Sequence, residues 1–559
     1  PPRSTPLYSS AASDVYKRQS SDNIPGVPKV GPKTACKWLQ EYGSLDQVIQ
    51  HADQILGKVG ENLRASLNQL SLARELATIK RDVPLEQTPA KLSPTSRDLD
   101  RLRELYAHLE FKTWLSELGG AQGVGSDRAG QLTEYEIILD DDLLESWINR
   151  LERAAYFSLD TETTSLNVMQ AEVVGMSFAD EVGRAAYLPF AHDYVGAPVQ
   201  LQREPTLERL RPLLENEDVI KIGQNLKYDR SVLLNHGIQL RGIRFDTMLE
   251  SYVLNSTASR HDMDSLALKH LGYNTITFED IAGKGKSQLT FNEIDLEKAG
   301  PYAAEDADIT LRLHQLLHPK LQEQTELLAL FDKIEVPLVP VLSTIERTGV
   351  RINIDMLVAQ SAELGVRIQE IEEQAYAIAG TPFNMASPRQ IQEILFEKLQ
   401  LPVRSKTPKG QPSTAENVLQ ELAIEHELPR LILEHRSFSK LRSTYTDKLP
   451  ELVDPTSGRV HTSYHQAAVG TGRLSSSNPN LQNIPVRTAE GRRIRAAFVP
   501  EHGAILLSAD YSQIELRIMA HLSGDDGLMA AFSAEQDVHR ATAAAVSYTH
   551  LTLPTNREV

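Results

Sequence analysis

The sequence contains almost no cysteine and no long apolar run. Its single cysteine, Cys36, excludes an internal disulfide and fits a reducing compartment. No apolar run is long enough to cross a bilayer, and the first residues lack the pattern of a signal peptide. We therefore expect a cytoplasmic protein that is not embedded in a membrane.

Basic residues are fewer than acidic ones. The chain has 58 Lys and Arg against 75 Asp and Glu, which gives a net charge of −17. Taken alone, this balance argues against a nucleic-acid-binding protein. It does not exclude one, because phosphate contacts need a local basic patch rather than a basic total. The remaining composition, with 41% hydrophobic residues, is typical of a globular protein.

The 559 residues are enough for about three or four domains. A glycine-rich segment that begins at Gly119 reads as a linker, and it separates helical sequence from sequence with strand character. We predict a leader at 1–19, a helical domain at 20–118, a linker at 119–131, an α/β domain at 132–322, a mainly helical domain at 323–546 and a tail at 547–559.

Paired acidic residues follow a predicted strand in the third of these segments. Tyr156–Leu159 reads as a strand that leads to Asp160 and Glu162. Residues two apart in a strand share a face, and two carboxylates so placed repel each other unless a cation lies between them. An isolated Asp-x-Glu is more often surface decoration, so this pattern needs support from elsewhere in the chain.

Two later segments supply that support. The strand Lys221–Gly223 passes into a helix that carries Asp229. Tyr302 and Asp306 are four residues apart in helical sequence and therefore share one helix face. Alone, Asp306 would be read as part of a solvated helix surface.

A further acidic residue follows an apolar run near the end of the chain. We predict that Ala504–Leu507 is a buried strand, that Asp510 lies at its end, and that a helix follows with Ile514 and Ile518 facing inward. An acid in this place suits metal-bound triphosphate chemistry. The alternative is a buried strand followed by an ordinary capped helix.

The stretch Leu507–Arg517 resembles motif A of the family A DNA polymerases. The resemblance implies that Asp510 binds the catalytic magnesium ions and that Glu515 excludes ribonucleotides. We count Gln513 with the nucleotide-binding residues. His539 matches a family position near the phosphates of the incoming nucleotide.

The three acidic segments together resemble the motifs of the DEDD proofreading exonucleases of the tyrosine subclass. The resemblance assigns two Mg²⁺ ions, for which Mn²⁺ can substitute, to Asp160, Glu162, Asp229 and Asp306. It makes Tyr302 the residue that orients the attacking water. Residues that match family positions holding the 3′-terminal nucleotide are Leu166, Asn225 and Phe278.

Segments before motif A also resemble the polymerase family. Arg436 and Lys440 belong to a basic cluster with an aromatic residue, which we expect to contact phosphates along the duplex; the alternative is a plain amphipathic helix. Polar amides suit reading of the minor groove, whose acceptors are nearly the same for every base pair. The residues expected to touch the primer–template duplex are Arg473, Asn480, Gln482 and Asn483.

The sequence Ser21–Ala35 resembles the helix-hairpin-helix of a 5′ nuclease domain. Only Asp22 remains of the aspartates in that motif, because Arg18 and Gln19 replace the expected Gly-Asp. The N-terminal part of such a nuclease has no counterpart in this sequence. We expect no 5′ nuclease activity from this segment.

The resemblance covers about Ser20 to Val546. We expect 1–19 and 547–559 to be foreign to the family, and the fingers helix and second polymerase aspartate to be absent. The predicted fold is a multidomain α/β protein: a helix-hairpin-helix remnant, a ribonuclease H-like 3′–5′ exonuclease domain, and an α+β polymerase thumb with part of the palm. Only the exonuclease site is expected to be complete.

Three readings of function follow. The first is a DNA polymerase of replication and repair with a proofreading exonuclease, and its partners are primer–template DNA, single-stranded 3′ ends and deoxynucleoside triphosphates. The second is a stand-alone DEDD exonuclease, and the third a non-catalytic DNA-binding protein. The segment Thr471–Arg517 favours the first, because a stand-alone nuclease has no use for it. We expect a monomer.

Overall fold

The computed structural model describes residues 26–80, 82–84, 97–109, 111, 113–114, 117–118, 134–258 and 260–547. The chain forms two compact units, 1–97 and 98–559, which are treated separately below. None of the described helices is long and apolar enough to cross a membrane. The predicted leader, Asp22, the linker 119–131 and the tail after residue 547 lie outside the described residues.

The first unit is helical, as predicted. The turn at residues 27–30, before the first helix, is closed by a hydrogen bond from Val30 N to Val27 O (3.2 Å). Lys29 adopts a positive φ of 63° in this turn. Trp38 and Leu63 are buried in a small core. The elements are α2 (Pro32–Tyr42), α3 (Leu45–Gln50), η1 (Ala52–Gln54) and α4 (Gly57–Ala77).

The second unit contains a six-stranded mixed sheet in the order β1-β4-β3-β2-β5-β6. Strands β2, β3 and β4 are antiparallel neighbours, whereas β1 joins β4, β5 joins β2, and β6 joins β5 in parallel. The strands are β1 (Glu134–Ile137), β2 (Tyr156–Thr163), β3 (Val173–Glu181), β4 (Arg184–Pro189), β5 (Ile220–Gly223) and β6 (Ile243–Asp246).

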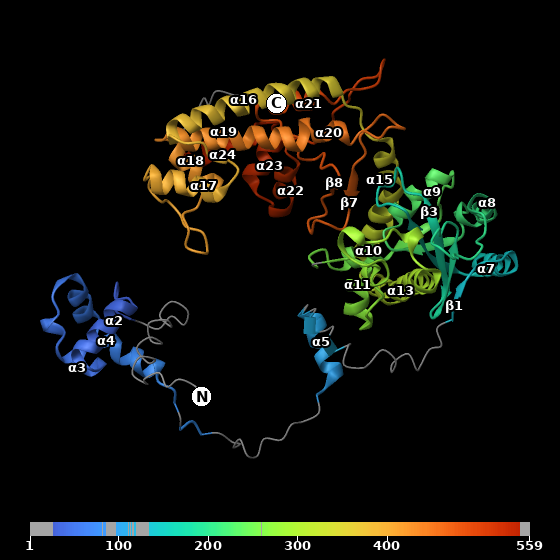
Figure 1. The fold of residues 1–559 in the computed structure, drawn as a ribbon. Coiled ribbons are helices and arrows are strands. Elements are labelled where there is room, and N and C mark those ends of the chain that lie inside the picture. Colours follow the sequence, from blue (N-terminus) through green and yellow to red (C-terminus); the bar gives the residue numbers. More distant parts are fainter. Residues whose placement is uncertain are drawn as a thin grey trace. The chain divides into compact units, whose positions relative to one another are not determined.

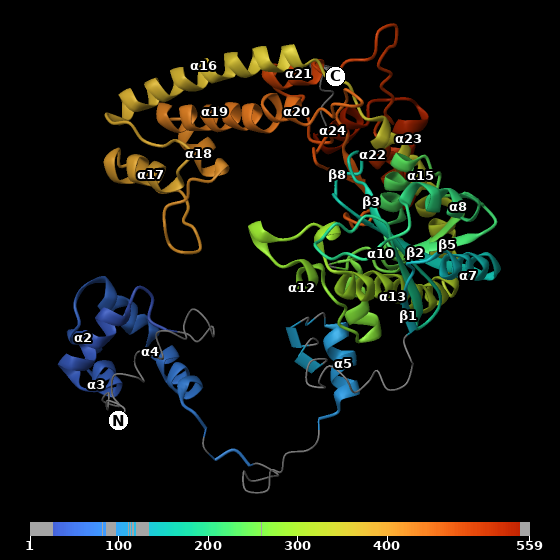
Figure 2. The ribbon, with the colours of Figure 1, turned by 45° about the vertical axis from the view of Figure 1, so that its right-hand side comes forward.

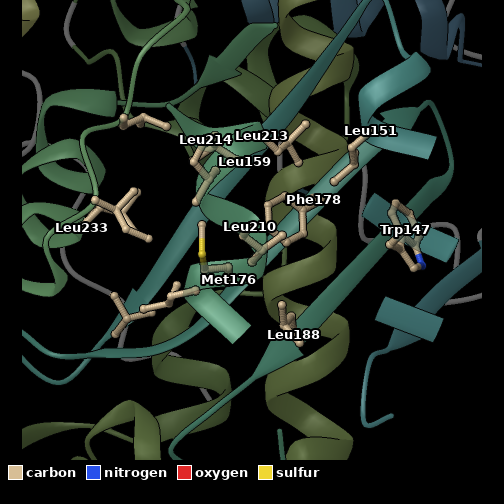
Figure 3. Packing of buried hydrophobic residues seen from close by; sticks show 14 of the residues in the cluster. Trp147, Leu151, Leu159, Met176, Phe178, Leu188, Leu210, Leu213, Leu214 and Leu233 are labelled. Atoms are coloured by element: carbon tan, nitrogen blue, oxygen red, sulfur yellow. The ribbon is translucent and has the colours of Figure 1, made fainter. Parts of the chain in front are cut away.

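Helices cover both faces of this sheet (Figure 1). Leucines of α7 and α8 pack with Trp147, Leu159 and Phe178 on one face (Figure 3), and α13 packs on the other through Ala304, Ala307 and other small residues. From residue 98 to residue 322 the helices of this unit, whether or not they pack on the sheet, are α5 (Leu99–His108), α7 (Asp141–Arg153), α8 (Arg203–Leu214), α9 (Leu226–Leu233), α10 (Thr247–Leu254), α11 (Met263–Leu266), α12 (Phe278–Ala282) and α13 (Leu296–Gln322).

Small residues let α13 approach the sheet closely. A Cβ atom at Gly300 would lie 2.5 Å from Cδ1 of Ile137, so a larger residue there would push the helix outward. Ala303, Ala304 and Ala307 are fully buried along the same helix. Larger side chains at these positions would therefore hold α13 farther from the sheet.

The remaining residues of this unit are mainly helical. Helix α16 lies along α19, and both contribute leucines and isoleucines to one core (Figure 2). Buried residues of α16, such as Leu357, Leu364 and Ile371, follow one face of the helix. The elements are α14 (Thr325–Leu330), α15 (Val336–Thr348), α16 (Ile354–Ala379), α17 (Pro388–Gln392), α18 (Glu416–Ala423), α19 (Glu427–Leu441), α20 (Lys448–Glu451), β7 (Ser463–His465), β8 (Ser475–Ser477), α21 (Ala489–Ala496), α22 (Ile514–Ser523), α23 (Asp526–Ser533) and α24 (Val538–Ser547).

The buried strand predicted at Ala504–Leu507 is wrong. These residues form no strand, and Leu507 is 88% exposed. The predicted helix exists as α22, but its supposed inward residues Ile514 and Ile518 are exposed. An apolar run forms a strand only when neighbouring backbone accepts its hydrogen bonds, and no described strand pairs with this one.

Two leucines of the sheet region allow a matched test of the core. Leu159 is fully buried and Leu166 is 92% exposed. We expect Leu159→Ala to lower the free energy of unfolding by about 2–5 kcal/mol, because it leaves a cavity, and Leu166→Ala to change it by less than about 0.5 kcal/mol. Urea denaturation of both variants checks this. Equal losses would show that the core is misplaced.

Candidate active site

Strand β2 presents two carboxylates to one side of the sheet. Asp160 and Glu162 lie two residues apart, and β3 and β5 hold the strand on either side. Thr161, between them, donates hydrogen bonds from N (3.0 Å) and Oγ1 (2.7 Å) to Oδ1 of Asp229 on α9. The predicted convergence of β2 and α9 is therefore confirmed.

Helix α13 brings a third carboxylate to β2. Oxygen atoms of Asp160, Glu162 and Asp306 lie within 4.8 Å of one another. The alternative interpretation of Asp306, as part of a solvated helix surface, is wrong, because its side chain is buried. This grouping of carboxylates is called the acidic cluster below, together with Asp229.

Burial and mutual repulsion disfavour negative charge in the acidic cluster. Burial raises the pKa of Asp160 to about 7. Burial, and then the charge on Asp160, raise the pKa values of Glu162, Asp229 and Asp306 well above their usual range. A nearby positive charge would offset this repulsion and favour the ionised carboxylates.

Two oxygen atoms of the acidic cluster, Glu162 Oε1 and Asp306 Oδ1, are buried without a hydrogen-bond partner. Unpaired carboxylate oxygens so close together are the ligand set that hard divalent cations prefer. The residues present therefore fit a divalent metal ion.

Tyr302 lies one helical turn before Asp306. Burial, and then the charge on Asp306, raise the pKa of its phenol, so it is neutral at physiological pH. Its ring lies near those of Phe278 (6.5 Å between centroids) and Phe291 (5.9 Å). Tyr302 is thus held beside the acidic cluster by helix position and by aromatic packing.

The start of α9 is fixed by Asp246. This buried carboxylate accepts hydrogen bonds from the backbone N atoms of Asn225 (3.1 Å) and Leu226 (2.8 Å), and also from two N atoms at the start of α10. Asn225 itself has left-handed backbone angles of 64° and 48°. One acid therefore sets where α9 begins, and hence where Asp229 lies.

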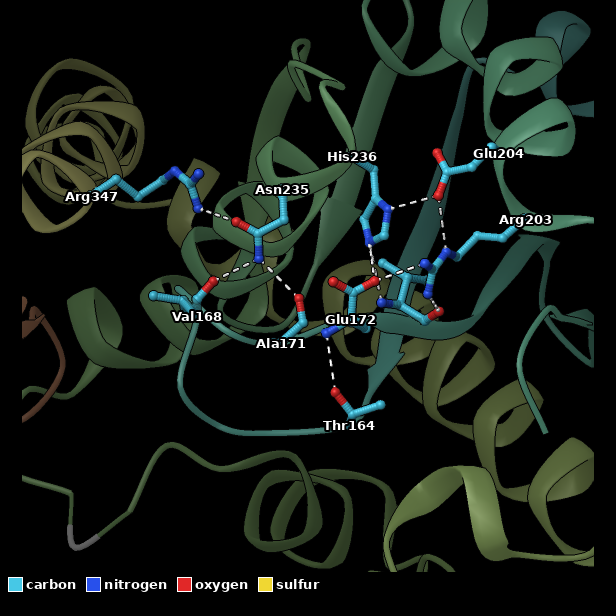
Figure 4. Close-up of polar contacts among 10 residues, drawn as sticks. Thr164, Val168, Ala171, Glu172, Arg203, Glu204, Asn235, His236 and Arg347 are labelled. Carbon is cyan, nitrogen blue, oxygen red and sulfur yellow. Dashed lines mark hydrogen bonds and ion pairs between the residues drawn. The ribbon is translucent and has the colours of Figure 1, made fainter. Parts of the chain in front are cut away.

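The loop after β2, which carries Leu166, is tied to η3 (Leu234–His236), the 3-10 turn that follows α9 (Figure 4). Nδ2 of Asn235 donates hydrogen bonds to the carbonyl oxygens of Val168 and Ala171, both at 2.9 Å. Its Oδ1 accepts one from Nη1 of Arg347 on α15 (2.7 Å). Arg347 belongs to a segment beyond the sheet region, so a distant helix helps to hold this loop.

Helix α9 also bears a buried cation that pairs outside the sheet region. Nζ of Lys227 donates hydrogen bonds to Oε1 of Glu346 and to the carbonyl oxygen of Tyr464. Sequence reasoning missed Asn235, Lys227 and their partners, because no periodicity connects residues more than 60 positions apart.

The residues predicted for DNA synthesis lie apart from the acidic cluster in the sequence and are mostly exposed. Asp510 is in an exposed, irregular segment. Arg473 and Glu515 form an exposed ion pair (3.1 Å), and Gln513 caps α22 in a left-handed conformation. Among the described residues, no group of three metal-ligating side chains includes Asp510.

The other predicted DNA contacts are exposed, except that Arg436 is half-buried. Nη1 of Arg436 donates to the carbonyl oxygen of Thr414 (2.8 Å), so this guanidinium is partly engaged within the protein. Lys440 on the same helix is exposed. Exposed positions are also occupied by Asn480, Gln482, Asn483 and His539.

Comparison with known families divides the chain in the same order as its fold. Residues 19–100 match the family model described as 5′-3′ exonuclease, C-terminal SAM fold; residues 135–322 match 3′-5′ exonuclease; and residues 354–558 match DNA polymerase family A. The last match extends over 547–558, which the sequence alone leads us to treat as foreign; that treatment stays a prediction.

The chain is also similar in sequence to bacterial proteins named DNA polymerase I. DNA polymerase I of Pseudomonas aeruginosa is 54% identical across 94% of this chain and 59% of its own length. That of Rhizobium leguminosarum is 39% identical across 94% of this chain and 60% of its own length. The solved POL domain of Pol1 from M. smegmatis, in complex with DNA primer-template and dNTP, is 30% identical, with a TM-score of 0.63 over 74% of this chain and 67% of that one.

The sheet with its acidic cluster lies in the part of the chain that matches the 3′-5′ exonuclease family, and the helical region after it lies largely in the part that matches DNA polymerase family A. The chain belongs to the bacterial DNA polymerase I family. It spans about 60% of the length of the curated relatives it matches. The predicted fold class is confirmed.

Repulsion in the acidic cluster predicts that removing one charge stabilises the metal-free protein. When folding raises the pKa of an acid, the contribution of that acid to the free energy of unfolding is lost as the pH rises through its folded-state pKa. In chelating buffer, we expect Asp306→Asn to raise the free energy of unfolding by about 1 kcal/mol or more, with the gain larger at pH 8 than at pH 5. Thermal unfolding at both pH values measures it.

The matched control for this experiment is Asp332→Asn. Asp332 is exposed, so its replacement should leave the unfolding midpoint unchanged at both pH values. A loss of stability in Asp306→Asn that is equal at the two pH values would contradict the repulsion argument.

Proposed function

We propose that this chain removes nucleotides from the 3′ ends of DNA, as the proofreading part of a DNA polymerase I. The observation that carries the proposal is the acidic cluster: three carboxylates within 4.8 Å, two of whose oxygens are buried and unpaired. A module that only binds DNA gains nothing from clustered acids facing phosphate.

The acidic cluster would hold two Mg²⁺ ions, with Mn²⁺ as a substitute. Asp160, Glu162, Asp229 and Asp306 are the proposed ligands. When bound, such ions lower the pKa of a water molecule and stabilise a leaving oxyanion. Thr161 contributes by fixing one oxygen of Asp229 through two hydrogen bonds, so that the other oxygen is free to turn toward a cation.

Tyr302 is the proposed residue for orienting the attacking water. Because its phenol stays protonated, it can donate one hydrogen bond and accept another at a fixed place beside Asp306. Because Tyr302 and Asp306 lie on the same helix, α13, the position of the water relative to the carboxylates would be fixed.

The terminal nucleotide would be held by Leu166, Phe278 and Asn225. Leu166 projects from the loop tied down by Asn235, and its exposed side chain is free to press on a base. The ring of Phe278 lies near that of Tyr302, which places an apolar surface beside the proposed water site.

For the whole protein we propose DNA-directed DNA synthesis in replication and repair, on primer–template DNA with deoxynucleoside triphosphates. Support comes from the family A match and from the solved relative in complex with primer-template and dNTP. Asp510, Gln513, Glu515 and His539 are the proposed nucleotide-side residues. We propose that the protein acts as a monomer in the bacterial cytosol.

The remaining proposed contacts lie along the duplex. Lys440 is exposed and suits a phosphate contact, whereas Arg436 would have to leave the carbonyl oxygen of Thr414 to make one. The proposed contacts in the minor groove are Arg473, Asn480, Gln482 and Asn483.

A 5′-labelled primer annealed to a longer template tests the nuclease. With Mg²⁺, we expect the primer to shorten, and Asp160→Ala to abolish shortening because a metal ligand is lost. Asp142→Ala, an exposed acid of the same domain, is the control and should remain active. Shortening that survives Asp160→Ala would refute the proposed site.

The same assay with the four deoxynucleoside triphosphates tests synthesis by this chain. We expect no lengthening, because the described residues place no three-ligand group around Asp510. Lengthening would show that this chain forms a working polymerase site.

Tyr302→Phe separates orientation of water from metal binding. Loss of the hydroxyl should lower the rate of shortening by about 100-fold through misplacement of the nucleophile. Binding of Mn²⁺, measured by calorimetry, should stay unchanged because Tyr302 is no ligand. An equal loss of Mn²⁺ binding would contradict the assigned role.

A further inference from the structure

A second group of metal-ligating side chains lies in the sheet region. Glu250 projects from α10, and His314 and His318 lie one turn apart on α13. Oε1 of Glu250 is 2.7 Å from Nδ1 of His314 and 3.5 Å from Nδ1 of His318. The three donor atoms all lie within 4.8 Å of one another. We call this group the histidine cluster.

Aromatic residues enclose the histidine cluster. The ring of Phe245 lies 4.3 Å from that of His314 and 4.6 Å from that of His318, measured between centroids. Tyr156 and Phe331 complete the wall. Glu250 is fully buried, whereas the side chain of His318 keeps 14% exposure and offers a route from solvent.

The histidine cluster leaves two buried polar atoms unsatisfied. Oε2 of Glu250 and Nδ1 of His318 are buried without a hydrogen-bond partner. A cation would satisfy the unpaired oxygen and would favour the carboxylate and the neutral imidazoles together.

We propose that Glu250, His314 and His318 form a binding site for a zinc-like divalent transition-metal ion. Two imidazoles and one carboxylate are a donor set typical of zinc, whereas magnesium prefers oxygen ligands alone. His314 is eight residues after Asp306, a rise of about 12 Å along α13. The histidine cluster is thus separate from the acidic cluster and binds a different class of ion.

An ion at this site cross-links α10 to α13. Helix α13 also carries Tyr302 and Asp306, and α10 begins at the Asp246 that fixes α9. The ion would therefore stabilise the frame of the proposed nuclease without touching its substrate. This role goes beyond the proposed function and does not depend on it.

The competing explanation is a hydrogen-bonded cluster in which Glu250 is protonated and no ion binds. Glu250→Gln distinguishes the two. The amide has the shape and neutrality of a protonated carboxyl group, so this variant would preserve a hydrogen-bonded cluster, but it removes the anionic ligand that a metal ion needs.

Co²⁺ is a suitable probe, because its visible absorption reports nitrogen and oxygen ligands. The full chain is stripped with chelator, dialysed, supplied with excess Mg²⁺ to occupy the acidic cluster, and titrated with Co²⁺. We expect one equivalent to produce a visible band that Zn²⁺ then removes. Glu250→Gln and His318→Gln should each abolish the band.

Two controls should retain the band: Asp306→Asn in the acidic cluster, and His502→Gln on the surface. Zn²⁺ should raise the thermal midpoint of the unaltered chain by several degrees and leave that of Glu250→Gln unchanged. Circular dichroism without metal checks whether each variant is folded. If Glu250→Gln is unfolded, His318→Gln supplies the test, because His318 is partly exposed.

A folded, unaltered chain that gives no band overturns the proposal. So does a band that persists in both Glu250→Gln and His318→Gln. Neither readout involves DNA, so a failure here is distinguishable from a failure of the proposed nuclease.

Discussion

Repulsion among buried carboxylates is the constraint on which the sheet region depends. Asp160 and Asp306 reach one point from a strand and a helix, although burial and their neighbours' charges oppose ionisation there. The compensation lies in the surrounding packing: Leu159 is fully buried beneath the strand, and small residues seat α13 against the sheet. The fold is thus less stable because it concentrates negative charge at one point, and a bound cation would reduce the repulsion there.

The same helix places two kinds of donor set along its length. Near Asp306 the donors are oxygen atoms, and near His314 they are a carboxylate and imidazoles. Hard cations prefer the first and borderline transition metals the second. The two classes of ion would then compete less for one site, because the type of ligand atom at each position favours one class.

Local periodicity predicted much of the acidic cluster. Spacings of two in a strand and four in a helix were enough to pair Asp160 with Glu162 and Tyr302 with Asp306, and the resemblance joined the pairs. Periodicity failed where partners decide the outcome. An apolar run such as Ala504–Leu507 forms a strand only if another strand receives it, and no described strand does. Contacts between distant elements, such as Glu250 with its histidines, leave no local signal.

The ion pair between Lys227 and Glu346 bears on what counts as a domain. The match to the 3′-5′ exonuclease family ends at residue 322, yet the helix that carries Asp229 is anchored by residues beyond that limit. A buried ammonium deprived of its carboxylate is strongly destabilising. Buried contacts of α9 therefore cross the boundary at which the family match ends. Removing the residues after 322 would therefore leave the ammonium of Lys227 without its carboxylate partner.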